Sequence, residues 1–171
     1  MKRLILAMVL VSCMAAGTAF AADMKIGYID MQRAINTSES GKEAKEQLAS
    51  RLKKYQDEIN TRQDDLKRLK DELEKQGMLL SESARAAKEK DYQQKLKEFQ
   101  RFTKDAQDEL QGKDEEFTRK ILEAMEKVIQ EYGRQNGYTF IFVKNETMLF
   151  ADEKADLTDE VLKLFNANRK K

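Results

Sequence analysis

The sequence lacks most of the residue types on which enzymes and metal sites depend. Its 171 residues include no His, no Trp and no Pro, and Cys13 is the single cysteine. One cysteine cannot form a disulfide framework within a chain. With no His and one Cys, the usual zinc and transition-metal ligand sets cannot be assembled, and the commonest general base is missing. We therefore expect no catalytic residues, no metal site and no cofactor.

Signals for nucleotides and nucleic acids are lacking as well. The chain contains neither a Gly-x-x-x-x-Gly-Lys-Ser/Thr loop nor a Gly-x-Gly-x-x-Gly motif after a strand. Its 32 basic residues are balanced by 31 acidic ones, whereas proteins that coat nucleic acids carry a basic excess. Charged residues nevertheless make up 37% of the chain, which, together with the absence of Pro, favours long exposed helices.

The first 21 residues have the pattern of a secretory signal peptide. Lys2 and Arg3 precede an apolar run, Leu4 to Val11, and small residues follow up to Ala19-Phe20-Ala21. These are the three regions of such a peptide, and the apolar run is shorter than the roughly 20 residues of a membrane span. The sequence therefore predicts export and cleavage after Ala21, which would leave 150 residues.

An alternative processing route stays open. Leu10-Val11-Ser12-Cys13 resembles a lipobox, in which the cysteine is lipidated and becomes the mature N-terminus. The mass of the intact mature chain distinguishes the two routes, because Cys13 is retained only in the second.

A long helix is predicted from about Lys42, with Ser38 or Ser40 as its N-cap. Apolar residues recur there at steps of three and four, which is an a/d heptad seam. A stripe this narrow must pack on a partner helix. The seam residues are Leu48, Leu52, Tyr55, Ile59, Leu66, Leu69, Leu73 and Leu80.

A second, longer helix is predicted from Ser81, its N-cap, to about Tyr132. The short connection after Gly77 makes the two helices antiparallel neighbours. We refer to residues 42–132, with a tip near 77–83, as the arm. Its second seam comprises Ala84, Ala87, Tyr92, Leu96, Phe99, Phe102, Ala106, Leu110, Phe117, Ile121, Met125, Val128 and Tyr132.

Short elements are predicted on both sides of the arm. Lys25–Asp30 reads as a strand, Tyr138–Val143 and Thr147–Ala151 as a β-hairpin, and the residues from Leu157 to Phe165 as a short helix. The predicted fold is mostly α with a small β part. A long antiparallel helical hairpin protrudes from a small β-rich oligomerisation body, formed by residues 22–41 and 133–171.

So few short strands and one small helix make a poor core for a single chain. We therefore expect the strands of the body to assemble between subunits. The apolar strand residues that are candidates for this interface are Ile26, Tyr28, Phe140, Phe142 and Leu149.

Charge is unevenly distributed along the second helix. Residues 85–104 carry a net charge of +4, and residues 105–116 a net charge of −5. The basic segment is either an ordinary solvated helix surface or an attraction site for anionic partners such as lipid headgroups or acidic polypeptides. Its bases are Arg85, Lys88, Lys90, Lys95, Lys97, Arg101 and Lys104.

Apolar residues at the tip are a second candidate contact site. Met78, Leu79 and Leu80 either close the end of the seam, as a hydrophobic staple does, or form an adaptable apolar tip that touches unfolded polypeptides. Phe102 lies slightly off the seam register, so we expect it to be partly exposed and add it to the contact candidates.

Four stretches resemble the Skp/OmpH family of periplasmic chaperones. They are Lys25–Ala34, Gly77–Arg85, Gly137–Ile141 and Leu157–Leu162, in that order along the chain. The resemblance implies a homotrimer in which a β-rich body carries three helical arms around a cavity. It also implies a periplasmic protein that holds unfolded outer-membrane proteins without ATP.

This chain departs from the family in its overall charge. Well-known members are strongly basic, whereas this sequence is near neutral, so any weak contact with lipopolysaccharide or anionic lipid would be confined to residues 85–104. The leading hypothesis is an ATP-independent periplasmic holdase for unfolded outer-membrane proteins. The alternative is a structural coiled-coil spacer or adaptor of the envelope, which a lipid on Cys13 would favour.

Overall fold

The computed structural model describes residues 24–76 and 80–169, and it shows the mostly helical chain with a small β part that the sequence predicts. The signal peptide and Cys13 lie outside the described residues. The elements in chain order are β1 (Ile26–Ile29), α2 (Met31–Thr37), α3 (Glu39–Gln76), α4 (Glu82–Gln135), β2 (Phe140–Val143), the 3-10 turn η1 (Glu153–Ala155) and α5 (Thr158–Asn168).

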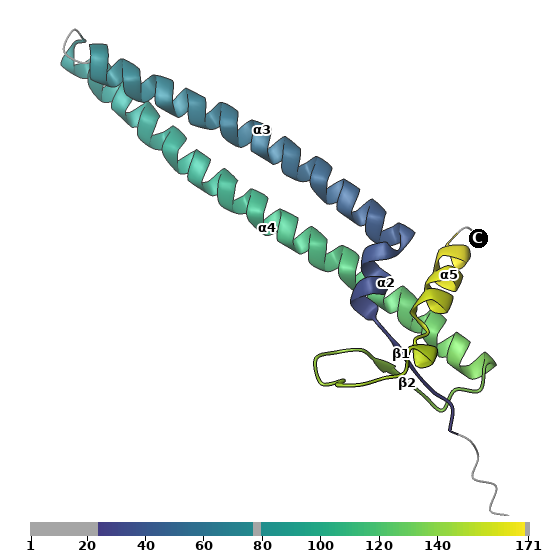
Figure 1. The fold of residues 1–171 in the computed structure, drawn as a ribbon. Coiled ribbons are helices and arrows are strands. Elements are labelled where there is room, and N and C mark those ends of the chain that lie inside the picture. The colour runs from purple at the N-terminus through teal and green to yellow at the C-terminus, as the bar shows by residue number, and fades with distance from the viewer. Residues whose placement is uncertain (1–23, 77–79, 170–171) are drawn as a thin grey trace, which may run out of the picture.

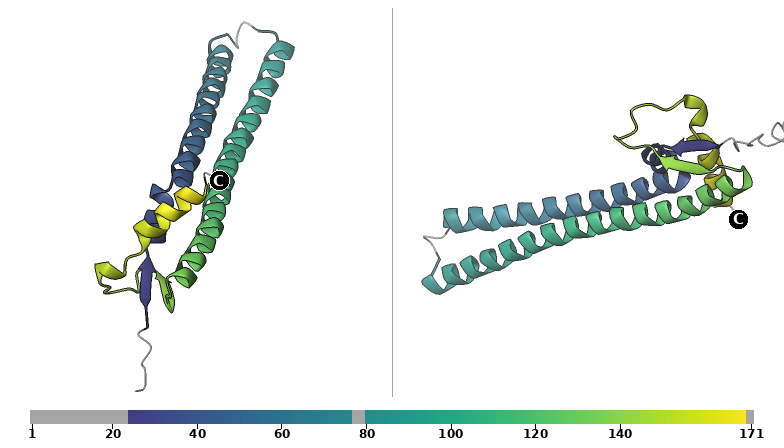
Figure 2. Two further views of the ribbon diagram at one scale, coloured as in Figure 1. Left: turned by 90° about the vertical axis from the view of Figure 1, so that its right-hand side faces the viewer. Right: turned by 90° about the horizontal axis from the view of Figure 1, so that it is seen from below.

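Helices α3 and α4 lie side by side and antiparallel, and they extend away from the small sheet (Figures 1 and 2). With 38 and 54 residues, they are ~57 and ~81 Å long at 1.5 Å per residue. Arg51 contacts Glu109 and Glu72 contacts Lys88. These two contacts define which residues of α3 face which residues of α4.

Packing between α3 and α4 is less complete than the seam predicts. Ile121, Met125 and Val128 are buried near the end of α4, but along the rest of the seam only Leu66 and Ala106 are buried, most other residues are half-buried, and Leu52 is 54% exposed. The seam assignment of Leu52 is therefore wrong. Next to Leu52 the contact between α3 and α4 is polar, because Arg51 and Tyr55 both bind Glu109.

Helix α3 begins at a tight junction with α2, a short helix that the polar sequence did not suggest. The Ser38 hydroxyl accepts a hydrogen bond from the Gly41 N–H at 3.0 Å and donates one to the Ile35 carbonyl at 2.9 Å. Of the two serines proposed as the N-cap of this helix, Ser38 and not Ser40 is therefore the capping residue. It places the start of α3 at Glu39, three residues before the predicted start.

Helix α4 ends in a Schellman motif. Gly137 has φ +68°, a conformation that glycine adopts without strain. The Tyr138 N–H donates to the Gly133 carbonyl at 2.9 Å, and the Gly137 N–H donates to the Arg134 carbonyl at 3.5 Å. The Asn136-Gly137 stop signal is therefore correct, and it directs the chain into β2.

The two strands are parallel, with Ile26 paired to Phe140 and Ile29 to Val143. The predicted β-hairpin is wrong for the described chain, because Thr147–Ala151 belongs to no strand. The chain bends after β2, where the Asn145 side chain accepts hydrogen bonds from the N–H and hydroxyl of Thr147 at 3.0 and 2.6 Å. The partner of β2 is instead β1, from the other end of the sequence.

A small apolar core lies where α5 packs on α2 and the last turns of α4. Met125 and Val161 are fully buried, and Ile29 is 1% exposed. The Asp30 N–H donates to the Thr158 hydroxyl at 2.9 Å, so the end of β1 is tied to the start of α5. The buried cluster comprises Ile29, Ala34, Ala44, Ile121, Met125, Val128, Leu157, Val161 and Phe165.

Candidate functional surface

The tip between α3 and α4 is only partly described. Met78 and Leu79 lie outside the described residues, and Leu80 is half-buried. Ser81 is the N-cap of α4, as predicted, and its hydroxyl accepts a hydrogen bond from the Ala84 N–H at 3.3 Å. The tip residues therefore remain a prediction from sequence.

Phe102 lies between the two helices. Its ring meets that of Tyr55 edge to face, with centroids 5.9 Å apart. The Arg62 guanidinium carbon lies 4.4 Å from the Phe102 ring centroid, a cation–π contact. Phe102 is half-buried, as are Tyr92 and Phe99, so it is partly exposed as expected but is not distinguished in this from the other two aromatic residues.

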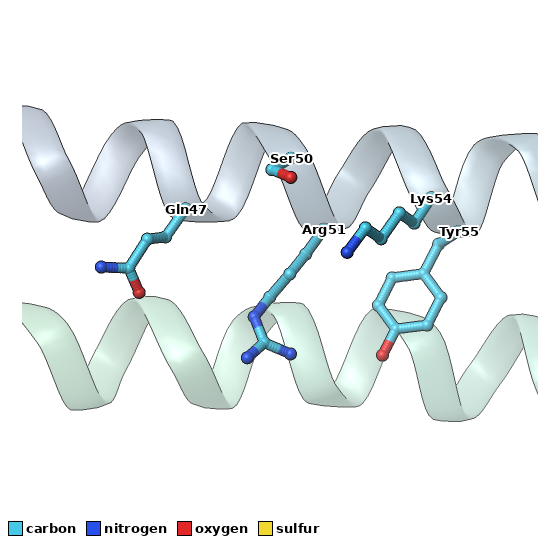
Figure 3. A pocket seen from close by; sticks show the side chains of 5 residues that line it. All are labelled: Gln47, Ser50, Arg51, Lys54 and Tyr55. Carbon is cyan, nitrogen blue, oxygen red and sulfur yellow. The ribbon is translucent and has the colours of Figure 1, made fainter.

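An open groove of about 380 Å³ lies beside this aromatic contact. Figure 3 shows Gln47, Arg51 and Tyr55 reaching from α3 toward α4. The Tyr55 hydroxyl donates to Glu109 at 2.5 Å, and Arg51 donates to the same carboxylate at 2.8 Å. The hydrogen bond to Glu109 is the main reason why the pKa of Tyr55 is raised. These contacts join the helices where apolar packing is sparse.

Four of the seven bases in residues 85–104 are held by carboxylates. Lys88 reaches across to Glu72 on α3 at 2.5 Å. Within α4, Arg85 pairs with Glu89 at 3.0 Å, Arg101 with Asp105 at 3.5 Å, and Lys104 with Asp108. The basic segment is thus interleaved with acids from both helices.

The same contacts shift two pKa values. The hydrogen bond from Lys88 lowers the pKa of Glu72, and the hydrogen bond to Asp108 raises the pKa of Lys104. Farther along α4, Glu116 accepts hydrogen bonds from Lys113 and Lys120, both at 2.6 Å. These two lysines lower the pKa of Glu116 to about 2. These shifts keep Glu72, Lys104 and Glu116 charged at neutral pH.

The outer face of the sheet exposes apolar side chains. Ile26, Phe140 and Phe142 are about half exposed, and the two Phe rings stack with centroids 5.9 Å apart. Tyr28, another interface candidate, is only 8% exposed and therefore packs within its own chain.

The loop after β2 is more exposed than the sheet. Leu149 is 96% exposed and its neighbour Phe150 is 88% exposed. Our list of candidates from the sequence missed Phe150. The signal was present in the sequence, because Phe150 is a large apolar residue directly beside the candidate Leu149.

Neither a metal centre nor a membrane span is found in the described part of the chain. Within residues 24–76 and 80–169, no three acidic residues are grouped so that they could hold a metal ion. No described helix is long and apolar enough to cross a membrane. The features on which a function can be built are therefore the α3–α4 pair and the exposed apolar residues around the sheet.

Over residues 25–165 the sequence matches the family described as outer membrane protein (OmpH-like). The fold is similar to that of a solved structure from Caulobacter crescentus CB15, which is named as a candidate outer membrane chaperone (OmpH-like). The TM-score is 0.79 at 18% identity, with 89% of each chain covered. At that identity the likeness concerns the fold alone. No curated protein matches the sequence.

Proposed function

This chain belongs to the OmpH-like family, and on that premise we propose that it is an ATP-independent holdase chaperone of the periplasm. Its clients would be unfolded outer-membrane proteins. The observation that carries the proposal is the α3–α4 pair, which extends away from the core and keeps most of its apolar seam only half-buried. Such a surface suits contacts with extended apolar segments better than recognition of one folded ligand.

We further propose that three copies assemble through the sheet and the loop after β2. The exposed Ile26, Phe140 and Phe142, together with Leu149, support this step, because a single chain of this kind leaves large apolar side chains in water. Assembly would bring three α3–α4 pairs around one space. The number three rests on the family resemblance.

Client binding in such an assembly would depend on several weak contacts. The candidates on each copy are Met78, Leu79 and Leu80 at the tip and the ring edge of Phe102. Each contact alone is weak, but contacts made by linked α3–α4 pairs multiply in affinity, since the second contact forms at a high effective concentration. Release requires only a more stable destination for the client, and therefore no nucleotide.

The direct test is to dilute an outer-membrane barrel protein from urea into buffer that contains the mature chain without nucleotide. Light scattering then reports aggregation of the barrel protein. We expect suppression at about one assembled trimer per client. A folded soluble protein added at the same mass is the control.

Undiminished aggregation at a several-fold excess of the assembled protein would exclude the holdase. The spacer alternative predicts that result, together with a mature chain that retains a lipidated Cys13. Intact-mass analysis of the chain purified from membranes therefore accompanies the scattering assay.

A further inference from the structure

The charges of α3 and α4 are complementary along the pair. Residues 85–104 of α4 contain seven bases and three acids, whereas the facing residues 56–75 of α3 contain seven acids and five bases. Closer to the core, residues 105–116 of α4 contain six acids and one base, and the facing residues 44–55 contain four bases and one acid. Each charged segment of α4 therefore faces a segment of α3 with a net charge of the opposite sign.

Individual contacts leave few of the bases available. Besides the four that are ion-paired, Lys95 lines a groove of about 220 Å³ together with Glu58, Asp65 and Glu98. Among the described residues, Lys90 and Lys97 are the bases of the segment that neither form an ion pair within 4 Å nor line that groove. They stand seven residues apart on one helix.

Among the described residues, the bases of the segment without an ion pair are Lys90, Lys95 and Lys97, and three such lysines attract a membrane only weakly. Segments that bind anionic lipid through charge alone carry clusters of four to eight Lys or Arg, and each base near the surface contributes about five-fold in affinity. An ion-paired base contributes less, because its acid is repelled by the same surface. The local potential follows the net charge, and here α3 lowers it.

We propose that Glu72, Asp105 and Asp108 are specificity-determining residues that keep the α3–α4 pair off anionic, phosphate-bearing surfaces. Each holds one base of α4: Glu72 holds Lys88, Asp105 holds Arg101 and Asp108 holds Lys104. Discrimination of this kind works through repulsion of the wrong partner as well as attraction of the right one. The basic segment is then a counterpart of acids within the chain and is not a docking site for lipid headgroups.

This inference goes beyond the proposed function and does not depend on it. It concerns the chemistry of the surface, so it holds whether or not the chain prevents aggregation. Weak affinity for anionic membranes would help a holdase, because a chain that carries clients between membranes would not be retained on the lipid surface.

The test is co-sedimentation of the mature full chain with vesicles, without any client. One set of vesicles contains 30% phosphatidylglycerol in phosphatidylcholine, and the other contains phosphatidylcholine only. The variant is the triple substitution Glu72→Gln/Asp105→Asn/Asp108→Asn. The matched control, Glu46→Gln/Glu126→Gln/Glu131→Gln, changes the net charge equally but removes acids that have no ion pair among the described residues.

At 150 mM salt we expect the natural chain and the control to bind both kinds of vesicle equally weakly. The Glu72/Asp105/Asp108 variant should bind the phosphatidylglycerol vesicles at least about ten-fold more tightly. Its affinity should also fall more steeply with added salt, a response that a merely structural effect would not produce. Circular dichroism of all three proteins checks that the helices remain folded.

Two outcomes would overturn the proposal. One is that the natural chain already binds phosphatidylglycerol vesicles as tightly as the variant. The other is that the folded variant gains no more than the control, in which case total charge and not these three acids sets the affinity. If the variant loses its helices, the single substitution Asp108→Asn gives the same comparison with the single control Glu126→Gln.

Discussion

Two glycines in the long helices occupy very different surroundings. A Cβ added to Gly41 would lie 1.9 Å from the Ile35 carbonyl oxygen, so the α2–α3 junction requires a residue without a side chain there. A Cβ added to Gly112, in α4, would meet nothing within 4 Å. The same substitution should therefore have opposite effects at the two positions.

We expect Gly41→Ala to lower the free energy of unfolding by a few kcal/mol, because backbone atoms cannot yield to a contact of that length. Gly112→Ala should raise it by about 0.5–1 kcal/mol, since alanine favours the interior of a helix. Urea unfolding followed by circular dichroism measures both. Equal effects of the two substitutions would show that the junction is not packed as described.

Asp30 should make stability depend on pH. Its carboxylate accepts the Arg33 N–H at 2.9 Å as the N-cap of α2 and pairs with Lys144 at 3.3 Å. The backbone hydrogen bond from Arg33 is the main cause that lowers the pKa of Asp30 below its ordinary 3.8. Ionised Asp30 therefore stabilises the fold above the pKa of the unfolded chain, and this stabilisation is lost as the pH falls through the lower, folded pKa.

We predict different losses in the free energy of unfolding for Asp30→Asn and Asp30→Ala. Urea unfolding of both variants and of the natural chain at pH 7 and pH 3 measures them. Asn still caps a helix, so Asp30→Ala should cost more, about 1 kcal/mol at pH 7. The deficit of Asp30→Asn should be smaller at pH 3 than at pH 7, because pH 3 lies below the ordinary pKa of 3.8 and part of the stabilisation by ionised Asp30 is lost there. A deficit that stays constant between the two pH values would contradict the assignment.

At the scale of the elements, α4 has two differently packed parts. Near its C-terminal end Met125 is completely buried, within the same core cluster as Val161 and Phe165. Outside the core cluster, by contrast, Leu66 and Ala106 are the buried apolar residues among the described residues of α3 and α4, and Leu52 is more than half exposed. Stability should therefore be concentrated where α5 covers α4.

Truncation of one residue from each region tests this distribution. Met125→Ala should cost 2–5 kcal/mol, because it leaves a cavity in the core. Leu52→Ala should cost less than about 0.5 kcal/mol, as expected for an exposed position. Urea unfolding of both variants gives the comparison. If Leu52→Ala lowered the free energy of unfolding nearly as much as Met125→Ala, Leu52 would have to be packed between the helices after all.

Local signals in the sequence were sufficient for the two long helices and for both ends of α4. Heptad spacing predicted α3 and α4, Ser81 predicted the start of α4, and Asn136-Gly137 predicted its end. Each of these depends on residues within a few positions of one another. The start of α3 was misplaced because Ser38 takes part in two helices at once, as the C-cap of α2 and as a hydrogen-bond acceptor for Gly41.

Features that join distant parts of the chain were harder to predict. Thr147–Ala151 has the composition of a strand, but the partner of β2 is β1, more than 100 residues away. The charges of residues 85–104, taken on one helix, also did not show which acids of the other helix face them. Only the pairing of α3 with α4 shows that Glu72 lies against Lys88.

On the scale of the whole molecule, the chain has one end rich in exposed apolar residues. Phe140 and Phe142 are half exposed, while Leu149 and Phe150 are almost fully exposed. A folded monomer would keep these side chains in water, which is the condition under which small domains associate. The proposed trimer follows from this surface together with the family resemblance.

We predict that the paired substitution Phe140→Ser/Leu149→Ser weakens assembly at least ten-fold, because it removes apolar area from the proposed contact. Leu52→Ser, which also removes an exposed leucine but lies on α3, should leave assembly unchanged. Sedimentation velocity over a range of concentrations measures the association of each variant. An unaltered trimer in the Phe140/Leu149 variant would place the interface elsewhere.

The central claim is that several copies of the chain hold one unfolded client without nucleotide. Native mass spectrometry of the mature chain, mixed with an outer-membrane barrel protein diluted from urea, tests it most directly. In a buffer without ATP, we predict a complex of three chains with one client. Chains detected only without client, while the barrel protein aggregates, would contradict it.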